Sequence, residues 1–271
     1  MAELLIITRN QETYSHQRLL RAAGNLSLKV EVLQSNQFVG LPEEPEHRLV
    51  LHRDSGISFD DIDLIVSKHL ENKGLKVINS TSTTELLRGK DKQFLFFKNF
   101  NLPHIPTFLC RGKLKPKELP PYDEFVVKTI RGNQGIGVML LKDSESLLSL
   151  LDSNHARKDE RYIIQPRLNF SSEYRVLLLN NEVLGVIEKK LTSDFRANAK
   201  RCETRKTLLP KEFEPLIQRI NELLPEQFLG VDIGIFNGEP VIIEINTTPG
   251  FEEFDKLHNF DTAQALIERN L

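Results

Sequence analysis

The stretch GVDIGIFNGEPVIIEIN, residues 230–246, gives the strongest indication of how this 271-residue chain folds. Two runs rich in β-branched and other apolar residues lie on either side of Asn237 and Gly238. Such a pair between two strand-like runs is typical of a tight turn. The stretch therefore predicts an antiparallel β-hairpin near the carboxyl end of the chain.

Three oxygen-bearing side chains of this hairpin, those of Asp232, Glu244 and Asn246, are candidates for a metal site. Glu244 and Asn246 are two residues apart, so they share one face of a strand. A three-residue loop, 237–239, places Asp232 opposite Glu244, whereas a two-residue loop moves Asp232 off that face. Two facing carboxylates in an apolar setting are costly, and a divalent cation removes that cost. Oxygen ligands favour Mg²⁺ or Mn²⁺ over zinc; the alternative is a solvated face with ordinary polar residues.

A lysine and a glycine-rich loop form a second candidate cluster. Lys128 ends the apolar run of a predicted strand, 125–128. In the loop that follows, Gly132, Gly135 and Gly137 allow backbone N–H groups to approach phosphate oxygens closely. Their spacing matches neither the Walker motif nor the dinucleotide fingerprint, and the loop alone is also consistent with a plain hairpin. Together with the distant oxygen cluster, it predicts a nucleotide held between two hairpins.

The opening segment alternates apolar strands with a helix, which predicts a parallel sheet in a small α/β unit. The expected elements of this unit are strands at 4–7, 29–33, 49–51 and 62–66 and a helix at 16–23. A single helix beginning at the Ser82-Thr83-Thr84-Glu85 cap is expected to run to Asn101. Asn180 and Asn181 predict a two-residue hairpin turn between two further strands.

Composition limits the function classes. The chain has 36 Lys and Arg against 38 Asp and Glu, a net charge of −2, which argues against direct nucleic-acid binding. Two cysteines, Cys110 and Cys202, exclude a disulfide framework. The apolar run at the amino terminus is too short for a signal peptide, and none near eighteen residues occurs elsewhere. We therefore expect a cytoplasmic protein without a membrane partner.

In combination, these segments resemble the ATP-grasp superfamily and, within it, the RimK-like glutamate ligases. The resemblance extends over nearly the whole chain. The motifs that carry it are, in order, Ile6-Ile7-Thr8-Arg9, Asp91-Lys92, Val126-Val127-Lys128, Gly132-Asn133-Gln134-Gly135-Ile136-Gly137, Ile187-Glu188-Lys189-Lys190, Asp194-Phe195-Arg196-Ala197-Asn198, Gly230-Val231-Asp232-Ile233 and Glu244-Ile245-Asn246-Thr247-Thr248-Pro249-Gly250.

The resemblance implies an α/β (α+β) ATP-grasp fold in three parts. These are an N-terminal α/β domain (1–85), a central subdomain (86–165) and a C-terminal antiparallel-sheet subdomain (166–271). ATP would bind between the last two parts.

The resemblance also implies roles for particular side chains. Lys92 and Lys128 would contact phosphates, and Glu173 would hold the ribose. Arg175 is the candidate for stabilising an acyl phosphate, with a salt bridge to Glu188 as the alternative. The remaining implied contacts are an adenine hinge at Gln165, Pro166, Arg167 and Leu168, a nucleotide-binding triplet at Arg196, Ala197 and Asn198, and two Mg²⁺ or Mn²⁺ ions on Asp232, Glu244 and Asn246.

The implied reaction is ATP-dependent ligation of a carboxylate to an amine through an acyl phosphate. The expected substrate is glutamate or another amino acid, and the acceptor is a peptide, a protein tail or a small molecule. Homo-oligomers are common in the family. A nucleotide-binding regulatory protein without ligase activity is the alternative from another class.

Three departures from the family pattern bear on these expectations. Cys202 and Glu203 stand where a glycine pair is usual, and Pro166 removes one N–H from the adenine hinge. In addition, the N-terminal domain is expected to lack a helix between Val66 and Gly74, which would leave the substrate cleft more open.

Overall fold

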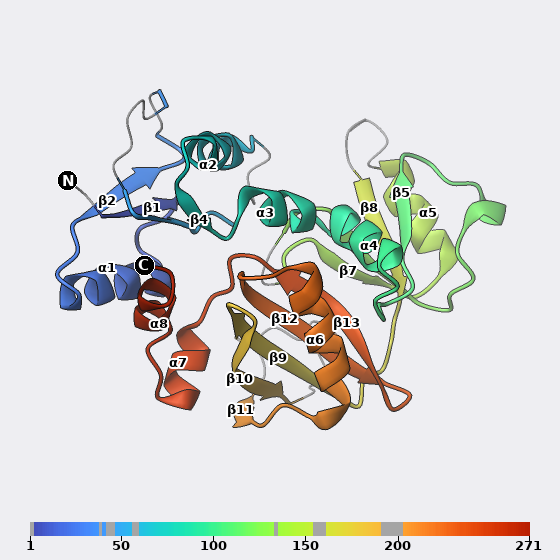
Figure 1. Ribbon diagram of the computed structural model, residues 1–271. Helices are drawn as coiled ribbons and strands as arrows, with labels where there is room; N and C mark the ends of the chain where they lie inside the picture. Colours follow the sequence, from blue (N-terminus) through green and yellow to red (C-terminus); the bar gives the residue numbers. More distant parts are fainter. Residues whose placement is uncertain are drawn as a thin grey trace.

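The computed structural model describes residues 3–37, 40–41, 47–55, 60–132, 135–153, 161–190 and 203–271. Within these ranges the chain forms three β-sheets with helices packed on them (Figure 1). None of the helices in these ranges has the length and apolar character needed to cross a membrane.

The N-terminal sheet is parallel, with the strand order β2-β1-β3-β4. Its strands are β1 (Leu4–Thr8), β2 (Val30–Gln34), β3 (Leu49–His52) and β4 (Lys76–Ile78). All residues of β1 and β3 are buried, as is usual when helices cover both faces of a sheet. Ile6 packs on the side of α1 (Tyr14–Asn25), whereas Ile7 packs against residues of α2 (Ile62–Asn72). The two helices therefore lie on opposite faces, as Figure 1 shows.

Two expectations for this unit were wrong. Residues 62–66 belong to helix α2 and not to a strand, and a helix does occupy the region from Val66 towards Gly74. The apolar residues around Val66 have the β-branched character of a strand. The buried face of α2, however, also carries Asp63 and Ser67, which a hydrophobic pattern does not register.

The central sheet is antiparallel, with the order β5-β8-β6-β7. Its strands are β5 (Phe108–Arg111), β6 (Phe125–Thr129), β7 (Val138–Leu141) and β8 (Arg161–Pro166), and helix α5 (Ser144–Ser153) packs on it through Leu147 and Leu151. The long helix expected from residue 82 is instead two helices, α3 (Thr81–Leu87) and α4 (Lys90–Asn99). They are separated at Gly89, whose φ of +90° interrupts the helix.

The C-terminal sheet is antiparallel, with the order β11-β10-β9-β12-β13. Its strands are β9 (Ser172–Leu179), β10 (Glu182–Lys189), β11 (Thr204–Thr207), β12 (Phe228–Phe236) and β13 (Glu239–Asn246). The turn at Asn180 and Asn181 is confirmed, with φ values of +50° and +69°. One face of the sheet packs under α6 (Glu214–Leu223) and the phenylalanines of α4.

The last helices, α7 (Glu252–His258) and α8 (Thr262–Glu268), return to the N-terminal unit. Leu266 shares a buried cluster with Leu4 of β1. The Tyr14 hydroxyl donates a hydrogen bond to Asp255 at 3.0 Å, and Arg18 forms a salt bridge with Asp261 at 2.6 Å. The two ends of the chain therefore pack together and fix the N-terminal unit against the C-terminal sheet.

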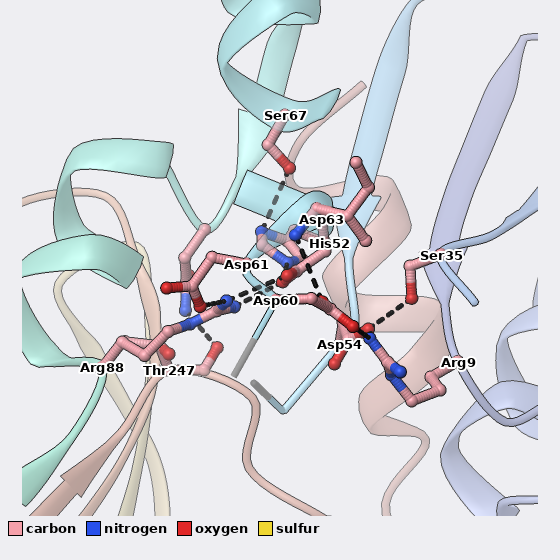
Figure 2. A network of polar contacts seen from close by, with 12 residues as sticks. Arg9, Ser35, His52, Asp54, Asp60, Asp61, Asp63, Ser67, Arg88 and Thr247 are labelled. Carbon is pink, nitrogen blue, oxygen red and sulfur yellow. Dashed lines mark hydrogen bonds and ion pairs between the residues drawn. The ribbon is translucent and has the colours of Figure 1, made fainter. Parts of the chain in front are cut away.

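A buried polar network holds α2 against β3 and α3 (Figure 2). The His52 ring lies between the Ser67 hydroxyl, at 3.2 Å, and the Asp63 carboxylate, at 2.7 Å. The carboxylate of Asp63 also accepts hydrogen bonds from the guanidinium of Arg88. Although Ser67, His52 and Asp63 are the residue types of a hydrolytic triad, Ser67 is fully buried, so the arrangement is structural.

We predict that Asp63→Asn destabilises the fold by about 3 kcal/mol, because it leaves the Arg88 guanidinium buried without its charge partner. Burial alone would raise the pKa of Asp63, but hydrogen bonds from Arg88 and His52 bring it well below the usual range. The stability that Asp63 contributes is therefore present near neutral pH and lost as the pH falls below about 4. Urea unfolding at pH 7 and at pH 3.5 measures both effects.

The matched control is Asp152→Asn, which removes an exposed carboxylate 3.2 Å from Lys113. We expect this control to stay within about 0.5 kcal/mol of the parent protein. An Asp63→Asn protein as stable as the control at pH 7 would contradict a stabilising role for the network.

Candidate active site

Asp232 and Glu244 lie opposite one another across the β12–β13 hairpin. The loop is shorter than the three residues expected, because Phe236 pairs with Glu239 across the two-residue turn at Asn237 and Gly238. By that register alone, Asp232 would not face Glu244.

A β-bulge restores the pairing. The register shifts between Asp232 and Ile233, since Ile233 pairs with Ile242 whereas Asp232 pairs with Glu244. Ile243 is the extra residue, and bulges of this kind redirect side chains near functional sites. The expected opposition of the two carboxylates is therefore confirmed, whereas the loop length on which it rested was wrong. Asn246 lies two residues beyond Glu244 and pairs with Gly230.

The cross-strand register gathers charged residues on one face of the C-terminal sheet. Arg175 of β9 pairs with Asp232 of β12, and Glu173 pairs with Lys189 of β10. Residues that alternate with these, such as Val176 and Val231, pack under α6 on the opposite face. One face of the sheet thus forms a core while the other presents the candidate site.

Two cations hold the Asp232 carboxylate. The Arg175 guanidinium donates two hydrogen bonds to it, from Nε to Oδ1 at 2.9 Å and from Nη2 to Oδ2 at 2.6 Å. The Lys189 ammonium lies 3.1 Å from Oδ1. Burial alone would raise the pKa of Asp232, but the charges of Arg175 and Lys189 lower it to about 2. Asp232 is therefore an anion throughout the physiological range.

The expected alternative for Arg175, a salt bridge to Glu188, does not form. Glu188 pairs instead with Arg205, at 2.7 Å from Nη2. Because Glu188 lies opposite Tyr174 rather than Arg175, its side chain belongs to the other face of the sheet.

Lys128, on strand β6 of the central sheet, lies near this charged face of the C-terminal sheet. Burial lowers the pKa of Lys128 to about 8, while the charges of Glu244 and Glu173 oppose that shift and the charge of Lys90 adds to it. Burial raises the pKa of Glu173, and the nearby Lys189 and Lys128 limit the increase. These mutual effects require the ammonium of one sheet and the carboxylates of the other to lie close together.

The glycine-rich loop lies next to Lys128. Gly135 and Gly137 have φ values of +75° and +76°, which favour glycine. A Cβ atom at Gly132 would come within 2.7 Å of the Ile136 carbonyl oxygen. The loop therefore needs glycine to fold back on itself, although residues 133–134 at its tip lie outside the described ranges.

Lys90, which the sequence analysis did not single out, is the α4 lysine that reaches this loop. Its ammonium donates to the Gly132 carbonyl at 3.1 Å. Lys92, the lysine expected to contact phosphates, lies 3.8 Å from Glu85 and is partly exposed. The signal for Lys90 was its position as the first residue of α4, directly after Gly89, which a motif centred on Asp91 and Lys92 overlooks.

The remaining expected residues fall in several places. Gln165 is buried and donates to the Thr107 hydroxyl at 2.7 Å, and Pro166 ends β8 opposite Phe125. Arg167 forms a salt bridge with Glu124 at 3.1 Å, and the half-buried Leu168 follows it. Arg196, Ala197, Asn198 and Cys202 lie outside the described residues, and Glu203 forms an exposed salt bridge with Lys190.

The donor set suits a hard divalent cation. Asp232, Glu244 and Asn246 supply carboxylate and amide oxygens from two paired strands. In the described part of the chain, a cluster of three or more His, Cys, Asp or Glu side chains able to hold a metal does not occur. A cation here would therefore take part of its coordination from ligand or water oxygens. Arg175 and Lys189 already neutralise Asp232, whereas the positive charge near Glu244 comes from Lys128 of the central sheet.

The chain is similar to known proteins of the RimK-like ATP-grasp family. Residues 120–269 match the model of the RimK-like ATP-grasp domain. The chain is 24% identical to a probable alpha-L-glutamate ligase of Haemophilus influenzae, over 98% of this chain and 96% of the relative. A probable alpha-L-glutamate ligase 2 of a Shewanella species is 26% identical, over 98% and 94%.

Two solved structures have a similar fold. A RimK domain ATP-grasp protein of Sphaerobacter thermophilus superimposes with a TM-score of 0.76 at 16% identity and 98% coverage of both chains. The ATP-grasp ligase PsnB, complexed with a minimal precursor, has a TM-score of 0.75 at 15% identity, with 99% and 98% coverage. These likenesses confirm an ATP-grasp fold with an antiparallel C-terminal sheet.

We predict that the ε-amino group of Lys128 loses its proton near pH 8 in the native protein. Because this pKa lies below the ordinary value of 10.5, the charged lysine costs stability below about pH 8. That cost disappears as the pH rises towards about 10.5. Competitive acylation across this range, read at Lys128 by mass spectrometry, measures the midpoint.

Glu244→Gln removes a charge that favours the protonated lysine, so it lowers this midpoint by about 0.5–1 unit. Acylation of the exposed Lys142 in the same samples is the internal control and stays the same in both proteins. If the pH midpoint for acylation of Lys128 were the same in Glu244→Gln as in the parent protein, the placement of Lys128 beside Glu244 would be contradicted.

Proposed function

The chain belongs to the RimK-like ATP-grasp family and is an ATP-grasp ligase, and we propose that it joins a carboxylate to an amine through an acyl phosphate, with glutamate as the amino-acid substrate. The observation that supports this most is the approach of Lys128, from the central sheet, to the carboxylates of Glu244 and Glu173 on the C-terminal sheet, where Glu244 faces Asp232. A nucleotide triphosphate with Mg²⁺ carries the charges that such a pair of surfaces complements.

In this proposal the C-terminal sheet holds the metal, and the central sheet with α4 binds the phosphates. Glu244, Asn246 and Asp232 would hold Mg²⁺ or Mn²⁺, and two ions could be accommodated because phosphate oxygens complete the coordination. The metal supplies charge neutralisation on the transferring phosphoryl group. Lys128 and Lys90 neutralise phosphate oxygens from the other side, and the backbone of the glycine-rich loop covers them.

The base and the sugar of the nucleotide are contacted by the other proposed residues. The adenine is bound at the end of β8, by Gln165, Pro166, Arg167 and Leu168, and the ribose is bound by Glu173. Lys92, Arg196, Ala197 and Asn198 are proposed further contacts to ATP. The burial of Glu173 in the charged face supports its role in binding the ribose, because a ribose hydroxyl would provide a hydrogen-bond partner for the buried carboxyl group.

The chemical steps use positioning and electrostatics. A substrate carboxylate oxygen attacks the γ-phosphorus of ATP, the bond to the β-phosphate oxygen breaks, and ADP leaves. The amine of the second substrate then attacks the acyl carbon and inorganic phosphate leaves, with loss of one amine proton to solvent or base. Arg175, already oriented by Asp232, donates to the acyl phosphate in this proposal.

The relatives favour glutamate as the amino acid, since they are named probable alpha-L-glutamate ligases. The acceptor is proposed to be a peptide or protein tail. Peptide and small-molecule acceptors are both open to this proposal, since the structures with a similar fold include the ligase PsnB complexed with a precursor peptide and a D-alanine–D-alanine ligase of Bacillus anthracis.

We predict that Glu244→Gln lowers ADP formation more than about 100-fold, because several kcal/mol of charge stabilisation at the phosphoryl group is lost. Glu244 is a cleaner target than Asp232, whose replacement leaves Arg175 and Lys189 without their carboxylate. The control is Glu239→Gln, at the exposed turn of the same hairpin, which keeps parent activity. Manganese binding in the presence of ADP, followed by electron paramagnetic resonance, should weaken in Glu244→Gln only.

The function itself is tested by ADP release across a panel of amino acids, with carboxylate-bearing peptides and small molecules as acceptors. We expect the highest turnover with glutamate and an amide-linked product by mass spectrometry. Binding of ATP without turnover on any pair would favour a regulatory nucleotide-binding protein instead.

A further inference from the structure

The carboxyl edge of the N-terminal sheet carries two arginines at the point where the strand order reverses. β1 leads to β2 on one side, and β3 leads to β4 on the other. Arg9 directly follows β1, and Arg53 directly follows β3. In open α/β sheets, ligands bind outside the carboxyl ends of the strands at this kind of switch point.

Only one of these arginines has its charge neutralised by the described part of the chain. Arg9 lies 3.3 Å from Asp54 and 3.2 Å from Asp60, so two carboxylates compensate it. Among the described residues, no carboxylate forms a salt bridge with Arg53. Arg53 is half-buried with its Nε atom buried, and guanidinium groups withdrawn from water are normally paired, so this difference needs an explanation.

The surroundings of Arg53 hold its guanidinium in place without neutralising it. The guanidinium carbon lies 5.5 Å from the centre of the Phe228 ring and 5.8 Å from that of Phe251. Nη2 donates to the Pro249 carbonyl at 2.8 Å, while Nε is buried and makes no hydrogen bond. Burial lowers the pKa of Arg53 to about 10, which is the signature of a charge that lacks an anion.

The position of Arg53 links it to the candidate active site. Pro249, which accepts its hydrogen bond, packs on Gly230, where an added Cβ would lie 2.8 Å from the Pro249 ring. Gly230 is paired with Asn246 and lies two residues from Asp232 on the same face of β12. Arg53 therefore approaches the strand ends that carry the proposed metal ligands.

Hydrogen bonds of one side chain join the N-terminal sheet to the C-terminal hairpin at this place. The side chain of Asn79, which follows β4, donates to the carbonyl oxygens of Phe228 and Thr247. Its own oxygen accepts from the Phe228 N–H. The arginine at the switch point thus has a fixed location relative to the C-terminal hairpin.

We propose that Arg53 binds a carboxylate of the amino-acid substrate that takes no part in the reaction, and so selects for acidic amino acids. This inference rests on the proposed ligase function and names a substrate-recognition residue for it. A planar carboxylate matches the two-pronged donor geometry of a guanidinium and supplies the missing negative charge. The phosphates of ATP are assigned to Lys128 and the glycine-rich loop, so they do not compete for this position.

The test compares L-glutamate with its two amides, L-glutamine and L-isoglutamine, each of which lacks one carboxylate. KM and kcat are measured by ADP release at saturating ATP and acceptor for the parent protein, Arg53→Lys and Arg53→Gln. We expect the parent to disfavour one of the two amides by about 10–100-fold in kcat/KM. Arg53→Gln should raise the KM for glutamate about 10–100-fold and abolish that preference, while the KM for ATP changes less than about threefold.

Loss of the preference separates recognition from a purely structural role. An arginine that only anchors Phe228 and Phe251 would, on replacement, lower the melting temperature and raise the KM values for glutamate and for ATP alike, while leaving the glutamate-to-amide ratio of kcat/KM unchanged. That result would overturn the proposal. Arg53→Lys keeps the charge but not the planar geometry, so it should retain part of the preference. The control is Arg48→Gln, an exposed arginine of the same unit, which should behave as the parent does.

A second measurement keeps this inference distinguishable from the proposed function. Calorimetric titration of L-glutamate into the protein with a non-hydrolysable ATP analogue and Mg²⁺ requires no turnover. Absence of turnover with every pair contradicts the ligase proposal, whereas glutamate binding that is weakened by Arg53→Gln supports the Arg53 site regardless. Glutamate binding of equal strength in the parent and Arg53→Gln contradicts that site.

Discussion

The pairing of two facing carboxylates, the buried Asp232 and the half-buried Glu244, beside cations is the constraint on which the candidate site depends. Asp232 and Glu244 face one another on a sheet whose other side is a hydrophobic core. Arg175 and Lys189 compensate Asp232 from the neighbouring strands. Glu244 depends on a charge from outside the sheet, and Lys128 of the central sheet supplies part of it. A face with this charge distribution is poised for a ligand that brings both cations and phosphate oxygens.

Two separate sets of contacts join the N-terminal unit to the surroundings of that face. Helices α7 and α8 pack the carboxyl end of the chain against the N-terminal unit, and Asn79 joins that unit to the ends of β12 and β13. On the other side, Asp61 at the start of α2 forms a salt bridge at 2.7 Å with Arg131 in the glycine-rich loop. The N-terminal unit therefore contacts both surfaces between which the nucleotide is proposed to bind.

Sequence patterns predicted the parts of the structure that local periodicity controls. The opening β-α-β unit, the turn at Asn180 and Asn181, and the presence of the β12–β13 hairpin could all be read from residue types and spacing, whereas the pairing of Asp232 with Glu244 depends on a bulge. The bulge at Ile243 could not, because an extra residue in a strand leaves no compositional mark when it too is apolar. The errors at α2 have a related cause, since Asp63 and Ser67 are buried by partners distant in the sequence. Lys90 and Arg53 were missed because their roles depend on which sheets meet, and this is a tertiary property.

A crystal structure of the protein grown with an ATP analogue and Mn²⁺, with anomalous scattering used to locate the metal, would show whether the nucleotide binds between the central and C-terminal sheets. We expect an anomalous peak within coordination distance of Glu244 and Asp232, with the phosphates lying between that peak and the Lys128 ammonium. A metal bound elsewhere, or phosphates bound away from Lys128, would contradict the central claim that these two sheets enclose the reacting phosphoryl group.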